Sequence, residues 1–176
     1  MMFPAAGLVV LTALLALGAC SPAFNWREVR PDNTPLSLLL PCKPDKLEKV
    51  VPLGGQNTTL AMLGCDAGGA TFAVAVADVG DADKAAPILA QWQRLTLANM
   101  QAGPDTVEVN PLKLRGAAAK PPPSVVQARG KRAEGADVSG QAAYFARGSQ
   151  VFQVVIYAQQ ITPEVAETYF SSLKFE

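Results

Sequence analysis

The chain has 176 residues, with 15 basic and 15 acidic side chains and no histidine. A balanced charge provides no general affinity for polyanions, so nucleic acid is not an expected partner. Without histidine, neither a Ser-His-Asp nor a Cys-His catalytic site can form within the chain. The composition therefore excludes the commonest hydrolase sites and speaks against a nucleic-acid-binding protein.

The N-terminus carries an apolar segment that ends at a cysteine. Residues 1–19 contain no charged side chain, and the aliphatic run from 7 to 18 is shorter than the roughly 20 residues of a membrane-spanning helix. Its length suits the hydrophobic region of a signal peptide, and Gly18 and Ala19 are small enough for a cleavage site. The basic residues that usually precede such a region are missing. We predict a signal peptide over residues 1–19.

The segment Leu17-Gly18-Ala19-Cys20 resembles the bacterial lipobox, in which a signal peptidase cuts before a diacylglycerol-modified cysteine. The resemblance implies that a lipid on Cys20 anchors the mature domain to the membrane. An uncleaved membrane anchor and an ordinary cleaved signal are the alternatives. A lipid anchor places the protein in the bacterial envelope, facing the periplasm, and Ser21 in place of an aspartate favours the outer membrane.

Two cysteines are left if Cys20 carries a lipid. In an exported domain, an even remainder favours a disulfide between Cys42 and Cys65. Two free buried thiols are the alternative. A thiolate metal site lacks ligands, because two cysteines without histidine are too few. We expect the disulfide, and we expect no metal or cofactor.

Residues 36–176 predict a single domain with strands and helices. Residues 20–35 contain three prolines among polar residues, which predicts an extended linker, although we expect Trp26 to pack on the domain. The expected strands span residues 36–40, 46–53, 71–79, 107–114, 142–146 and 151–158. Strand 71–79 alternates large side chains such as Phe72 with alanines, and a helix can pack closely on the alanine side.

Turn and capping residues separate these strands. The glycine pairs Gly54-Gly55 and Gly68-Gly69 predict hairpin turns. Apolar residues at helical spacing, Leu95 among them, predict a helix that starts near residue 85 and ends before Gly103-Pro104. Thr162-Pro163-Glu164 marks the start of a second helix, because it combines a capping hydroxyl, a first-turn proline and an acid.

The segment 116–124, GAAAKPPPS, predicts an exposed proline-rich loop. It lies within a basic stretch, 113–132, that contains no acid. Such a stretch can contact anionic lipid or an acidic partner, but the lack of interleaved aromatic residues favours a solvated segment.

Asp78, Asp81 and Asp83 are spaced closely enough to suggest a calcium loop. The positions that need glycine and glutamate hold Asp83 and Leu89, so helix capping is the better interpretation. Neither a paired-carboxylate motif nor a nucleophile elbow occurs in the sequence. We therefore expect a protein that is not an enzyme.

Two stretches, LLLPCKPDKLEKVV and the closing YFSSLKF, together with the central hairpin, resemble the PsbP/Mog1-like family. The resemblance implies an α+β fold in which an antiparallel sheet is covered by two helices. Cys42 stands where the family pattern usually has glycine. Members include photosystem accessory proteins, a small-GTPase binder and many bacterial lipoproteins, so the resemblance implies fold more than function.

Two functions follow as hypotheses. The first is a non-catalytic envelope lipoprotein, an accessory or binding module with a possible protein partner. The alternative is a small-molecule-binding or enzymatic domain whose site lies between sheet and helix, lined by Trp92, Tyr144 or Tyr157.

Overall fold

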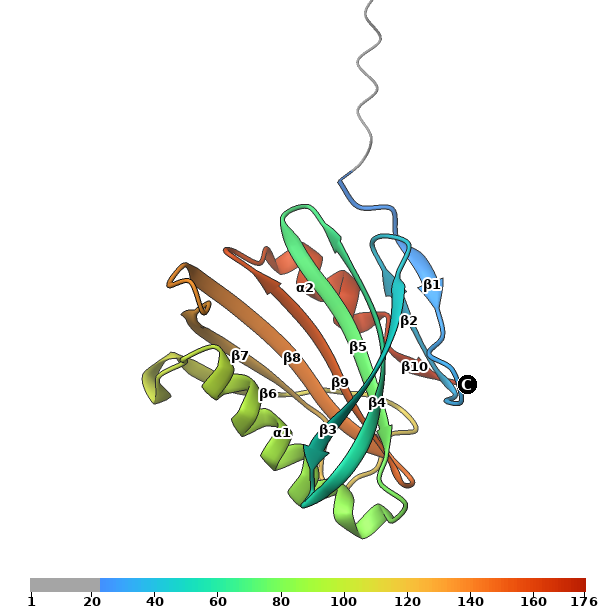
Figure 1. Ribbon diagram of the computed structural model, residues 1–176. Coiled ribbons are helices and arrows are strands. Elements are labelled where there is room, and N and C mark those ends of the chain that lie inside the picture. The colour runs from blue at the N-terminus through green and yellow to red at the C-terminus, as the bar shows by residue number, and fades with distance from the viewer. Residues whose placement is uncertain (1–22) are drawn as a thin grey trace, which may run out of the picture.

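The computed structural model describes residues 23–176 (Figure 1). Within that range the chain has the predicted α+β architecture, with a seven-stranded antiparallel sheet, a three-stranded sheet and two α-helices. The strands of the large sheet lie in the order β3 (Asp45–Leu53), β4 (Gln56–Ala67), β5 (Ala70–Asp78), β9 (Gln150–Ala158), β8 (Asp137–Arg147), β7 (Ser124–Lys131) and β6 (Val107–Pro111).

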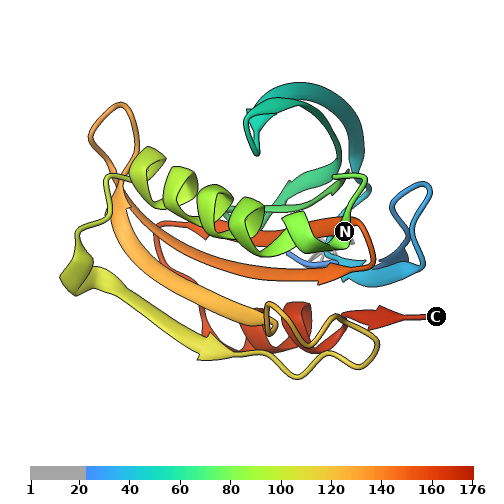
Figure 2. The same cartoon turned by 90° about the horizontal axis from the view of Figure 1, so that it is seen from below.

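The remaining elements lie against the two faces of the large sheet. In the small sheet, β2 (Leu36–Leu40) pairs with β1 (Arg27–Val29) and with β10 (Lys174–Phe175). Helix α1 (Ala85–Asn99) covers one face, whereas α2 (Pro163–Ser171) and the small sheet lie on the opposite face (Figures 1 and 2). The expected sheet covered by two helices is confirmed, with one helix on each face.

Strand β5 shows why the two faces differ. Phe72 and Val74 are fully buried on the α2 side, whereas Ala75 and Ala77 belong to the core beneath α1. Because these methyl groups are small, α1 packs closely and Trp92 is buried against the sheet. Strand β9 lies between β5 and β8 and is buried on both faces, as its continuous apolar run predicts.

Two-residue turns close the hairpins β3–β4 and β4–β5. Gly54 and Gly55 have φ values of 68° and 77°, and Gly68 and Gly69 have values of 58° and 75°. Both central positions of a type I′ turn need this left-handed region, which glycine adopts at little cost. The predicted turns are confirmed.

The boundary between linker and domain lies earlier than predicted. Trp26 packs on the core, as expected, but residues 20–35 are not a free linker over their described part. Arg27–Val29 form β1, and the rings of Phe24 and Trp26 lie 6.1 and 5.9 Å from that of Phe72. The folded domain therefore includes these residues, because aromatic burial and strand pairing hold them in place.

The proline-rich segment is also less exposed than predicted. Residues 116–124 contain no helix and only the first residue of β7, but the N–H of Ala118 donates to the carbonyl of Ala146 at 2.7 Å. The chain continues as β7, a strand that we did not predict because it lies within the basic stretch. In β7, Val125 and Val126 are buried on opposite faces of the sheet. Strand β6 ends at Pro111, before the predicted end at residue 114, and lies at the edge of the sheet, where a proline is tolerated.

Helix α1 follows a short 3-10 turn, η1 (Ala82–Lys84). Asp81 caps this turn by accepting a hydrogen bond from the N–H of Asp83 at 2.9 Å, whereas α1 itself follows Lys84 and has no side-chain cap. The capping interpretation is therefore confirmed for the turn and wrong for the helix. The helix ends at Asn99, before the predicted Gly103-Pro104. Leu95, expected on the buried stripe, is 45% exposed and lines a hollow between α1 and the β3–β4 hairpin.

Candidate functional site

Cys42 and Cys65 form the predicted disulfide, with their Cα atoms 6.0 Å apart. Cys42 lies just after β2, separated from it by Pro41, and Cys65 lies in β4, so the bridge ties the small sheet to the large one. No helix in residues 23–176 is long and apolar enough to cross a membrane. Cys20 lies outside the described residues, so its lipid modification stays a prediction.

The β3–β4 hairpin curls out of the sheet toward the side that carries α1 (Figure 2). Its turn touches the helix: the N–H of Gly54 donates to Oε1 of Gln91 at 2.8 Å, and a Cβ at Gly54 would collide with Ile88. A groove of about 420 Å³ separates the rest of β3 and β4 from α1. We call it the α1 groove; its lining includes Leu47, Lys49, Met62, Trp92, Leu95 and Gln153.

The walls of the α1 groove are largely apolar. Leu47 on β3 is 58% exposed, and Leu95 on α1 is 45% exposed. These are two of four large hydrophobic side chains that are exposed within residues 23–176, and both line this groove. Exposed apolar side chains that gather in a concavity are typical of a binding surface.

The floor of the groove is polar and ordered. The side-chain amide of Gln153 donates to Oγ1 of Thr96 at 2.8 Å and to the hydroxyl of Tyr144 at 3.0 Å. The hydroxyl of Thr96 in turn donates to the carbonyl of Trp92 at 3.0 Å. These hydrogen bonds compensate for the burial of three polar side chains between α1 and the sheet.

Two of the three aromatic residues that we expected in a sheet-helix site line the groove. Trp92 and Tyr157 are part of its lining, whereas Tyr144 is buried beside Gln153. Burial raises the pKa of the hydroxyls of Tyr144 and Tyr157 above the usual value. Both hydroxyls are therefore neutral near pH 7, and that of Tyr144 accepts a hydrogen bond from Gln153.

One cation lies among the apolar walls. Leu47, Lys49 and Val51 lie on the same face of β3, since alternate residues of a strand share a face. All three line the groove, and Lys49 is the only charged side chain in its described lining. The lining thus combines apolar walls, a neutral polar floor and a single positive charge.

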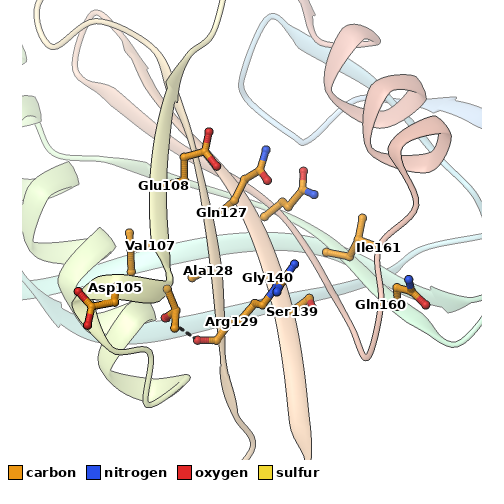
Figure 3. A pocket seen from close by; sticks show the side chains of 12 residues that line it. Asp105, Val107, Glu108, Gln127, Ala128, Arg129, Ser139, Gly140, Gln160 and Ile161 are labelled. Carbon is orange, nitrogen blue, oxygen red and sulfur yellow. Dashed lines mark hydrogen bonds between the residues drawn. The ribbon is translucent and has the colours of Figure 1, made fainter.

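A second hollow, of about 630 Å³, lies on the opposite face of the sheet, between β6, β7 and β8 and the segment after β9 (Figure 3). Glu108 and Arg129 are exposed there, and the Thr106 hydroxyl donates to the carbonyl of Arg129 at 2.8 Å. Gln127 and Gln160 also line it. We interpret this hollow as solvent-facing sheet surface, because its charged groups are exposed and of both signs.

The other candidates from the sequence have structural roles. Asp78 accepts a hydrogen bond from the N–H of Gly80 at 2.8 Å, which fits a turn and not a calcium loop. Residues 23–176 contain no group of three acidic, cysteine or histidine side chains placed to hold a metal. In the basic stretch, Lys131 pairs with Asp137 at 2.6 Å and lowers the pKa of that carboxyl.

Sequence reasoning missed Gln153, Thr96 and Lys49 as residues of a site. A signal existed for two of them. Gln153 interrupts the apolar run VFQVVIYA, and Thr96 lies four residues after Trp92, on the buried stripe of the helix. A polar residue at a position that the pattern marks as buried indicates a hydrogen-bond network or a site.

A scan against protein-family models found no match for this chain. A search of curated proteins also found no similar sequence.

Proposed function

We propose that the chain is a lipid-anchored protein of the bacterial envelope that acts by binding and not by catalysis. The α1 groove is its binding surface. The observation that carries the proposal is the combination, in one groove, of exposed apolar walls with an ordered polar floor. The walls supply affinity, and the polar groups and Lys49 in the lining supply orientation.

The N-terminus and the disulfide support the location. The lipobox-like segment ending at Cys20 supports a lipid anchor, and a disulfide is typical of an oxidising compartment such as the periplasm. An α+β domain with a covered antiparallel sheet agrees with a PsbP/Mog1-like module on a membrane tether. Ser21 after the cysteine favours the periplasmic face of the outer membrane.

Two experiments in a bacterial host test this proposal. Metabolic labelling with a palmitate analogue should mark the protein, and Cys20→Ser should remove both the label and membrane fractionation.

A photoreactive amino acid at position 95 should capture a ligand or partner in living cells, whereas the same residue at position 109 should not. Val109 is a matched control, since it is 55% exposed and lies on β6, at the other edge of the sheet. Equal capture at both positions would contradict the proposed surface.

A protein partner is the second candidate, and the edge strand β3 favours it. Its nine residues pair only with β4, and Leu47 and Val50 are 58% and 61% exposed. An extended segment of a partner can add to such an edge through backbone hydrogen bonds. A tagged pull-down from detergent-solubilised envelopes should then recover a specific protein with the natural chain and lose it with Val50→Asp, but not with Val109→Asp.

A further inference from the structure

We propose that the α1 groove binds an amphiphile with a single acyl chain and an anionic head group. The chain lies between the apolar walls and the head group at Lys49. This inference rests on the proposed function, which makes the α1 groove the binding surface.

The walls account for the acyl chain. They belong to β3 and β4 on one side and to α1 on the other, and each side exposes a leucine to the groove, Leu47 and Leu95. A flexible apolar chain between them removes both leucines from water. Trp92 adds an aromatic surface at the helix side of the same groove.

The charge accounts for the head group. Lys49 stands between Leu47 and Val51 on the stripe of β3 that faces α1, and its partner across the hairpin is Leu60. No carboxylate occurs in the described lining of the groove, so an anionic head group meets no like charge there and can pair with Lys49.

Gln153 on the floor does not compete with Lys49 for the head group. Both amide hydrogens of Gln153 are already donated, one to Thr96 and one to Tyr144. The Gln153 amide therefore has no free hydrogen with which to bind a carboxylate or phosphate. The ammonium of Lys49 is the cationic donor that such a head group meets in the groove.

Photo-cross-linking with the purified full chain in phosphatidylcholine nanodiscs tests the inference. Three probes share one diazirine-bearing acyl chain and differ in the head group, which is a carboxylate, a phosphate or a trimethylammonium. We expect light-dependent attachment to peptides of the β3–β4 hairpin and α1, with the anionic probes favoured by about threefold to fivefold. A preference between carboxylate and phosphate distinguishes a fatty acid from a lysophospholipid.

Matched variants separate the charge from the walls. Lys49→Gln should abolish the preference for anionic probes, whereas Lys113→Gln, at an exposed position of the loop after β6, should keep it. Leu47→Asp should reduce attachment of every probe, and Val109→Asp should not. Lys49 is exposed, so Lys49→Gln should fold normally. The comparison of Lys49→Gln with Lys113→Gln therefore tests the head-group site even if Leu47→Asp fails to fold.

Two results would overturn the inference: equal attachment of anionic and cationic probes, or attachment outside the groove peptides. The proposed function has separate readouts, namely the label on Cys20 and capture from position 95 in cells. If these succeed while the amphiphile probes fail, the groove is a binding surface and the ligand class is wrong.

Discussion

The two faces of the large sheet are built differently. On the face under α2 and the small sheet, which we call the covered face, aromatic rings fill the core: Phe72 lies 5.3 Å from Tyr169, and Phe145 lies 5.0 Å from Phe152. On the face under α1, which we call the α1 face, the β3–β4 hairpin diverges from the helix and leaves the α1 groove.

The two faces divide stability and binding between them. The covered face buries large side chains, among them Phe72, Phe145 and Tyr169, so it supplies a large share of the hydrophobic stabilisation. On the α1 face, apolar side chains are less completely buried. Leu47 and Leu95 are exposed at the groove, whereas the amide of Gln153 on its floor is buried. The covered face should therefore tolerate little change, and the rim of the α1 groove should tolerate much.

Phe72→Ala should give the largest effect. Phe72 is fully buried and its ring contacts those of Trp26 and Tyr169, so its removal leaves a cavity in the covered face. We expect the free energy of unfolding to fall by about 3–5 kcal/mol in urea titrations.

Leu95→Ala is the matched control on the other face, and it should change stability by less than about 0.5 kcal/mol. Each face holds one of the two tryptophans, so Trp26→Phe and Trp92→Phe backgrounds let fluorescence report on each face separately. Similar losses for Phe72→Ala and Leu95→Ala would break the contrast between the faces.

Cys42→Ser tests the attachment of the small sheet to the covered face. The bridge spans a sequence separation of 23, and its loss should lower the free energy of unfolding by about 3 kcal/mol on the chain-entropy model. Membrane attachment should persist, because the proposed lipid anchor is on Cys20 and not on Cys42. A chain that lacks Cys20 but keeps Cys42 and Cys65 should show no thiol reactive to maleimide until it is unfolded and reduced. Free thiols in unfolded but unreduced protein would contradict the bridge.

Local patterns in the sequence predict most of the strands and both helices. Strands β2, β3, β5 and β9 follow from apolar runs or alternation bounded by glycine and proline, and helix α2 follows from the cap at Thr162. The disulfide was predictable from the cysteine count. These features depend on residues close in sequence or on a simple inventory.

Features that depend on distant parts of the chain were not predictable. Strand β1 forms because it pairs with β2 and because the neighbouring rings of Phe24 and Trp26 pack against Phe72. The α1 groove depends on the curl of β3–β4 relative to α1, which no local pattern encodes. Leu95 fits the helical stripe, and only the divergence of the hairpin leaves it exposed.

Thr96→Val tests the floor of the α1 groove. The change keeps the shape of the side chain but removes the acceptor for Gln153 and the donor to the carbonyl of Trp92. We expect a loss of about 1–2 kcal/mol in the free energy of unfolding. Thr59→Val, at an exposed position of β4, is the control and should be nearly neutral. An equal effect of both changes would mean that the buried network contributes no stability.

Ser37→Ala should give the smallest effect and the opposite sign. Ser37 on β2 is 1% exposed, and its hydroxyl has no hydrogen-bond partner within residues 23–176, unlike the buried polar side chains of the α1 face. Removing an unpaired buried hydroxyl removes its desolvation penalty, so the free energy of unfolding should rise by up to about 1 kcal/mol. The same urea titrations measure it, with Ser171→Ala, an exposed serine at the end of α2, as the control. A loss of stability would show that the Ser37 hydroxyl is hydrogen-bonded in solution. Ser37 would then not differ from the buried polar side chains of the α1 face.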